Sequence, residues 1–119
     1  MKELLISLLE TFGYPVFLQG TLSQDEPYPE SFFTFWNNSS YDAAHFDNNA
    51  VRFTWSFDVN FYSVDPALVN SVLLEAKTLL KQNGFIISGK GYDLYSDELT
   101  HTGRGMNALI MDRQINMEV

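Results

Sequence analysis

The sequence predicts a single-domain α+β fold in which two helices pack on one face of a mostly antiparallel sheet. Its 119 residues, of which 45% are hydrophobic, suffice for one core and leave no room for two, so a single domain over residues 1–119 is expected. One segment alternates strictly between apolar and polar residues, which is typical of a strand with one buried face. Two other segments place their apolar residues at helical spacing. The expected order is α-β-β-β-α-β-β.

The chain begins with a helix predicted over Lys2–Phe12, because apolar residues recur there at helical spacing and Gly13 suits the end of a helix. The apolar stripe consists of Leu4, Leu5, Leu8, Leu9 and Phe12. Tyr14–Leu22 is predicted to be extended, with its proline near the start, where a strand tolerates one. Ser23–Glu30 is predicted as a polar, proline-bearing loop, and Ser31–Trp36 as an aromatic strand.

Asn37–Asn49 is predicted as a long connection, since its residues are polar and turn-forming at both ends. Connections of this length without regular structure are usually functional or disordered. Tyr41, His45 and Phe46 supply side chains that can contact a partner. The segment is therefore either a binding arm or a flexible loop, and the residues alone favour neither.

Arg52–Phe61 carries the clearest pattern in the chain. Its apolar residues are all odd-numbered: Phe53, Trp55, Phe57, Val59 and Phe61. Its polar residues are all even-numbered: Arg52, Thr54, Ser56, Asp58 and Asn60. A slip of one residue would turn every large apolar side chain outward, so the register of this strand is fixed. We expect one face to be buried under the helices and the other to be wet or open to a partner.

The second helix is predicted to begin at Asp65, an N-cap residue, with Pro66 in the first helical position. Its apolar face consists of Leu68, Val69, Val72, Leu73, Ala76, Leu79 and Leu80. Lys77 and Lys81 lie near the negative end of the helix dipole, and Asn83 with the following glycine ends the helix.

The last part of the chain is predicted to form a closing pair of strands. Phe85–Ser88 begins the first, Gly89–Gly91 loosens or bulges the chain, and Tyr92–Tyr95 continues the strand. Asp97–Thr102 is predicted as a turn, and Met106–Ile115 as the final strand.

The charge balance argues against several classes of partner. The net charge is −8, and the chain has only 7 Lys and Arg residues, scattered along it. Nucleic acid is bound mainly by neutralising phosphates with such residues, so DNA or RNA binding is not expected, nor is an anionic membrane. The absence of cysteine excludes disulfides and suits a reducing compartment. Because Glu3 lies in the first apolar run and no stretch is long enough to cross a bilayer, we expect a cytoplasmic protein.

Three motif-like patterns have simpler explanations. Gly84–Gly91 matches the start of a phosphate-binding loop, but it ends in glycine where a magnesium-binding hydroxyl is needed and it follows a helix. His45 and His101 lie in predicted loops without the spacing of metal ligands. No metal or cofactor is therefore expected. Asp93 and Asp97, together with His101, leave weak acid–base catalysis as an alternative.

The order of elements resembles the tail-terminator (tail-completion) family of long-tailed bacteriophages and prophages. The segments that carry the resemblance are Lys2–Phe12, Tyr14–Leu18, Ser31–Trp36, Arg52–Tyr62, Asp65–Asn83, Phe85–Tyr95 and Met106–Arg113. The likeness spans nearly the whole chain, but it rests on pattern and not on a signature motif. It implies a structural virion protein without catalytic residues, assembled in the bacterial cytoplasm.

Members of this family form a ring, commonly of six subunits, on the head-proximal end of the tail tube. The implied partners are other copies of the chain, the major tail tube protein and a head-completion or connector protein. By this analogy we expect Asn37–Asn49 and Asp97–Thr102 to contact other subunits or the tube. Arg52 and Arg104 are candidates for ion pairs with a neighbouring subunit. The candidate interaction residues are Tyr41, His45, Phe46, Arg52, Asp97, His101 and Arg104. The acidic balance suits a ring that DNA passes through without sticking. The alternatives are a small cytoplasmic adaptor or inhibitor and another head–tail connector protein.

Overall fold

The computed structural model describes residues 1–19, 28–46, 49–96 and 100–113; within these, residues 39–46, 49–53 and 112–113 are described by their backbone alone. The elements, in chain order, are α1 (Lys2–Glu10), β1 (Val16–Leu18), β2 (Ser31–Phe46), β3 (Asn49–Ser63), α2 (Pro66–Gln82), β4 (Ile86–Ile87), β5 (Tyr92–Leu94) and β6 (Thr102–Arg113). The predicted α+β class and the order of helices and strands are confirmed, with the first closing strand divided into β4 and β5.

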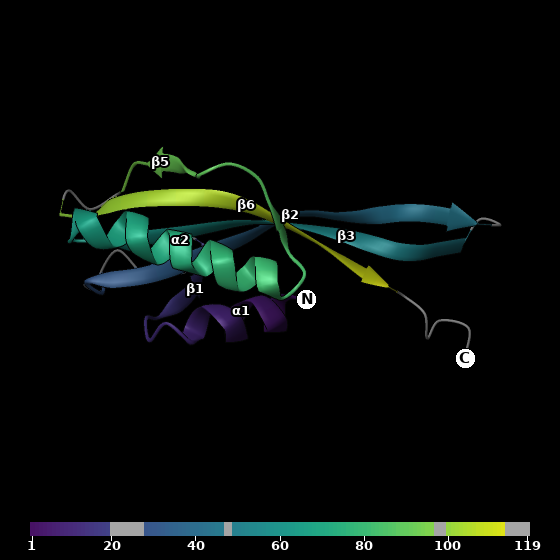
Figure 1. Ribbon diagram of the computed structural model, residues 1–119, viewed down its shortest axis with the longest axis horizontal. Helices are drawn as coiled ribbons and strands as arrows, with labels where there is room; N and C mark the ends of the chain where they lie inside the picture. The colour runs from purple at the N-terminus through teal and green to yellow at the C-terminus, as the bar shows by residue number, and fades with distance from the viewer. Residues whose placement is uncertain (20–27, 47–48, 97–99, 114–119) are drawn as a thin grey trace.

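The strands form one sheet with the order β1-β2-β3-β6-β4, and β5 pairs with β6 off this path. The β1–β2 pair is parallel, and the described pairs of β2 with β3 and of β6 with β3, β4 and β5 are antiparallel. The sheet is therefore mostly antiparallel, as predicted. Figure 1 shows both helices on the same side of this sheet, with α2 running along β6 and α1 beside β1.

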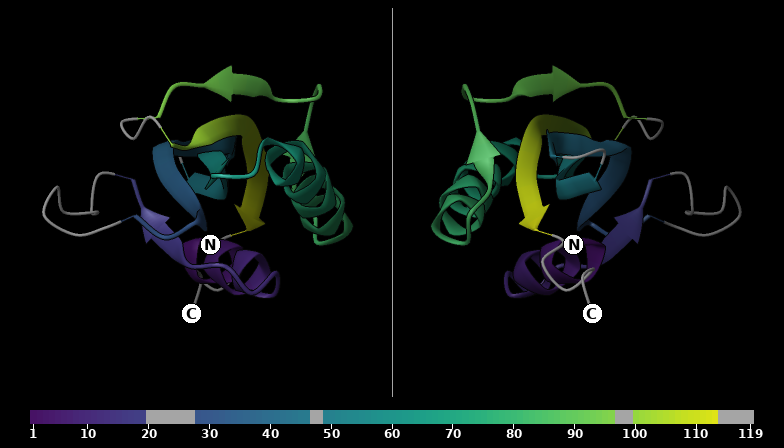
Figure 2. Two further views of the ribbon diagram at one scale, coloured as in Figure 1. Left: turned by 90° about the vertical axis from the view of Figure 1, so that its left-hand side faces the viewer. Right: turned by 90° about the vertical axis from the view of Figure 1, so that its right-hand side faces the viewer.

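The core lies between the helices and the odd-numbered side chains of β3. Phe57, Val59 and Phe61 are 0% exposed, and Trp55 packs partly buried against the same cluster. From the helices the core receives Leu5, Leu9, Val72, Leu73, Ala76 and Leu80. The two end-on views in Figure 2 show α2 beside β6 and α1 below the strands. The alternation in the sequence thus predicted the buried face of β3 correctly.

The start and end of α2 follow the predicted signals. The Asp65 carboxylate accepts a hydrogen bond from the Ala67 backbone N–H at 3.0 Å, and Pro66 occupies the first turn. Gly84 follows the helix with a φ of 95°, a conformation that glycine adopts without a steric cost. The end of α1 is a little shorter than predicted, because Thr11 and Phe12 already lie in the turn that Gly13 completes.

The prediction of a long connection over Asn37–Asn49 is wrong. β2 continues to Phe46 and β3 begins at Asn49, so the two strands form a long hairpin. Register shifts lie between Asn37 and Ser39 and on both sides of Ala44. Such bulges disturb the alternation of side chains, which explains why the sequence does not read as a strand here.

Other boundaries differ for local reasons. β1 spans only Val16–Leu18, and the rest of the predicted strand to Leu22 and most of the Ser23–Glu30 loop lie outside the described residues. Thr102 begins β6 and does not end a turn, so this strand starts well before Met106. The start of β6 contains glycines, which are uncommon in strands, so the sequence pattern does not predict a strand there. Gly103 is needed because a β-carbon at this position would lie 2.5 Å from the Tyr62 ring.

The face of the sheet away from the helices is not uniformly wet, in contrast to our expectation. Phe32 is 2% exposed, and its ring packs against the rings of Phe17, Tyr28, Tyr62 and His101. The hydrogen-bonded amide of Asn60 is also buried on this face. One end of the outer face therefore has a small aromatic core of its own.

Candidate interaction surface

Past the helices the sheet continues as an arm of three strands. We define this arm as Ser39–Phe46 of β2, Asn49–Ser56 of β3 and Met111–Arg113 of β6, which follow the core residues Phe57 and Ile110 along the sheet. It accounts for the elongated shape, which measures 53 × 29 × 22 Å, and Figure 1 shows it projecting to the right of both helices. The antiparallel ladder with β3 holds the polar stretch of β2 in place, since Ser40, Tyr41 and Asp42 pair in turn with Trp55, Thr54 and Phe53.

Both long sides of the arm are sheet edges. β1 pairs with Phe33–Phe35 and stops there, so β2 is the outer strand over Ser39–Phe46 within the described chain. On the other side β4 pairs with Ala108 and Leu109, and in the same described part β6 is the outer strand from Ile110 onward. An outer strand presents a row of backbone N–H and C=O groups that can pair with a further strand.

Large exposed apolar side chains lie at both edges. Leu18 and Trp36, on the β1–β2 side, are 39% and 47% exposed; Ile86 and Met111, on the β4–β6 side, are 56% and 49% exposed. Strand register assigns Trp36, Ile86 and Met111 to the face away from the helices, because they are level with Asp58, Leu109 and Thr54 respectively. Two opposite edges of one sheet thus carry exposed apolar groups on the same face.

Four of the predicted interaction residues lie on this arm. Tyr41, His45 and Phe46 are on β2 and pair with Thr54, Ala50 and Asn49, and Arg52 is on β3 opposite Ala44 and Arg113. Their side chains lie outside what the structure describes, so their contacts remain predictions. Asp97 also lies outside the described residues.

His101 lies just before β6, in the predicted loop, but it is buried and not exposed. The residue is 9% exposed, and its ring lies against Tyr28 and Phe32. Nε2 is 2.8 Å from the Pro29 carbonyl oxygen, so it carries the proton and donates, while Nδ1 lies 3.0 Å from the Thr100 hydroxyl. Both ring nitrogens are therefore engaged within the chain. This position supports a structural role in the aromatic cluster of the outer face.

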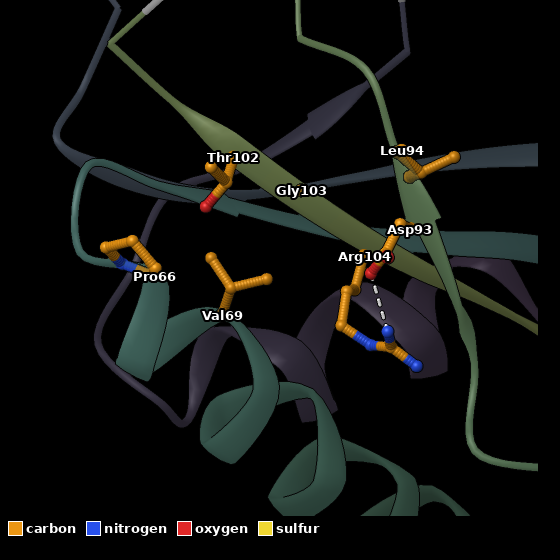
Figure 3. Close-up of a pocket in the computed structure, with 7 residues that line it drawn as sticks. All are labelled: Pro66, Val69, Asp93, Leu94, Thr102, Gly103 and Arg104. Carbon is orange, nitrogen blue, oxygen red and sulfur yellow. Dashed lines mark hydrogen bonds and ion pairs between the residues drawn. The ribbon is translucent and has the colours of Figure 1, made fainter.

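Arg104 makes its ion pair inside the chain. Its guanidinium donates from Nη1 to Asp93 Oδ1 at 2.6 Å and from Nη2 to the Lys90 carbonyl oxygen at 2.9 Å. The pair lines a cavity of about 320 Å³ at the start of α2, shown in Figure 3, whose other lining residues are Pro66, Val69, Leu94, Thr102 and Gly103. An inter-subunit ion pair of Arg104 would have to displace Asp93, whose side chain is 88% exposed.

The outer face also perturbs one titratable group. Partial burial, and then the negative charge of Asp58, raise the pKa of the Tyr92 phenol. Tyr92 stands on β5 opposite Gly105, where the missing β-carbon leaves room for its ring. The phenol therefore stays neutral and can act as a hydrogen-bond donor at neutral pH.

Sequence reasoning missed the edge residues Trp36, Ile86 and Met111. One signal was available for the first: Ser31–Trp36 carries aromatic residues at both odd and even positions, which indicates apolar groups on both faces of the strand. Nothing in the sequence marked the other two, because only the pairing of β4 with β6 brings Ile86 beside Leu109.

Comparison with protein-family models and with curated proteins gives no match to this chain. Neither helix among the described residues is long and apolar enough to cross a membrane. The same part of the chain contains no group of three or more His, Cys, Asp or Glu residues placed to hold a metal ion.

Proposed function

We propose that this chain is a structural protein of a long-tailed phage or prophage, which caps the head-proximal end of the tail tube as an oligomeric ring. The observation that carries the proposal is the arm, whose two open edges project beyond the helices. A sheet extended past its own core, with both edges unpaired by strands in the described chain, is suited to pairing with other chains. The order of elements, which resembles that of tail terminators, supports the same function.

The charge of the chain fits this role. Each subunit adds a net charge of −8 to the ring. A ring at the head–tail junction must let DNA pass. A negative lumen repels phosphates and keeps the DNA from binding to the wall. The capping ring would stop growth of the tube and present a surface to the head-completion or connector protein.

The proposal predicts that a major tail tube protein is encoded beside this chain, and that protein supplies the direct test. That protein is allowed to polymerise with and without the purified chain, and tube lengths are measured by negative-stain electron microscopy. The proposal predicts that tubes stop growing at low molar ratios of the chain and carry extra density at one end. Tubes of unchanged length with bare ends would contradict it.

A small adaptor or inhibitor that binds one host protein is the alternative. It is favoured by Trp36 and Tyr92, which are 47% and 45% exposed on the face away from the helices. The oligomeric state separates the two functions. Light scattering after size-exclusion chromatography should give a ring for the first and a monomer at all concentrations for the second.

A further inference from the structure

We propose that neighbouring copies of this chain join edge to edge through the arm, with the outer edge of β2 in one copy lying along the outer edge of β6 in the next. The inference rests on the proposed function and names the contact that would close the ring.

The directions of the strands make this contact repeatable. β2 and β6 are each antiparallel to β3, so they run in the same direction on opposite sides of the arm. A second copy related by rotation about an axis that runs along the strands therefore presents its β2 parallel to the β6 of the first. Because the two joined edges are different surfaces, every copy keeps one free edge for the next. Such a heterologous contact forms closed rings when the rotation closes.

The exposed apolar side chains also suit a contact between two different edges. Trp36 lies on the β2 side, Ile86 and Met111 lie on the β4–β6 side, and all three are on the face away from the helices. Joining the two edges brings the Trp36 of one copy toward the other two residues of its neighbour, and removing this apolar surface from water is favourable. A two-fold contact between two β2 edges would leave Ile86 and Met111 uncovered.

The edge of β2 also lacks the usual protection against pairing. Isolated edge strands are commonly short, or carry lysines or prolines that discourage a further strand. Over Ser39–Phe46 the sequence has no proline and no lysine, and Asp42 is its only Asp or Glu. A long edge of this composition is suited to a permanent strand partner, and the second copy supplies one of matching direction.

The test uses one variant for each side of the contact. Trp36→Glu places a charge on the β2 side, and Ile86→Glu places one on the β4–β6 side. Native mass spectrometry should show a species larger than a dimer for the wild type and a monomer for each variant alone. Mixing the two variants should give a 1:1 heterodimer and nothing larger, because each supplies the side that the other lacks.

The control is Leu74→Glu, which charges an apolar side chain 41% exposed on α2, on the opposite face of the sheet from Trp36 and Ile86, and should leave the wild-type mass unchanged. Circular dichroism and thermal unfolding verify that all three variants are folded. Several results would overturn the proposal: a wild type that is monomeric at every concentration, variants that assemble as the wild type does, or a mixture that remains monomeric.

The contact and the proposed function can fail separately. If both edge variants still assemble and still cap tubes, the contact is wrong and the proposed function stands. If the variants form the heterodimer but the wild type leaves tube growth unchanged, the contact stands and the proposed function is wrong.

Discussion

Replacing Phe32 by alanine tests the second aromatic core on the outer face of the sheet. The Phe32 side chain is 2% exposed, although it lies on the side that alternation alone assigns to solvent. Its ring centroid is 5.9 Å from that of Phe17, 5.6 Å from Tyr28, 5.3 Å from Tyr62 and 5.9 Å from His101. Removing the ring would leave a cavity among four other rings.

The expected loss of stability is large. Phe→Ala substitutions in protein cores lower the free energy of unfolding by about 3–5 kcal/mol. At about 2.1 cal/mol/K per residue, a chain of 119 residues has an unfolding entropy near 0.25 kcal/mol/K at its midpoint. The melting temperature of Phe32→Ala should therefore fall by about 12–20 °C.

Thermal unfolding followed by circular dichroism measures this shift. The protein must be dilute enough that the melting temperature no longer depends on concentration, since assembly also stabilises the fold. The control Leu74→Ala removes a side chain that is 41% exposed and should cost less than about 1 kcal/mol. If Phe32→Ala melts within about 3 °C of the wild type, the outer face is wet and the aromatic core does not stabilise the fold.

Three further changes test separate parts of the fold. Gly105→Ala would place a β-carbon 2.3 Å from Asn60 Oδ1 and should lower the free energy of unfolding by about 1–3 kcal/mol in urea titrations; an unchanged midpoint would show that the strands separate easily. Asp65→Ala removes the N-cap of α2 and should cost about 1 kcal/mol in the same assay, whereas Asp65→Asn should cost less. Burial and the Asp58 carboxylate raise the pKa of Tyr92, so the stability from Tyr92 is fully present below its unfolded pKa of about 10 and is lost as the pH rises through the folded value. Asp58→Asn should lower this pKa in an NMR titration, and no change would mean that the two groups do not interact.

The sequence predicted those parts of the fold whose signals are local. The N-cap and proline at Asp65 and Pro66 place the start of α2, and the strict alternation over Arg52–Phe61 assigns the buried face of β3. Both signals depend on neighbouring residues alone. Together with the helical spacing over Lys2–Phe12, they predict the α+β class.

The remaining features depend on pairing between distant segments. The bulges beside Asn37 and Ala44 disrupt the alternation, so only the ladder with β3 identifies this part of β2 as a strand. Gly103 lies between the predicted turn and the predicted final strand, because its packing against Tyr62 cannot be inferred without the register. The edge residues were missed for the same reason, since an edge is defined by where a neighbouring strand stops. Of the predicted interaction residues, His101 is buried and bonded to the Pro29 carbonyl, and Arg104 is paired with Asp93.

Hydrogen exchange along Ser39–Phe46 measures whether the arm is an ordered hairpin that a second copy covers. In the monomeric Trp36→Glu variant, amides that point toward β3 should be protected, and those on the outer side should exchange rapidly. In the assembled wild type the outer amides should become protected as well, and their protection should rise with protein concentration. Rapid exchange of every amide in this segment, at all concentrations and in both proteins, would contradict the hairpin and the assembly built on it.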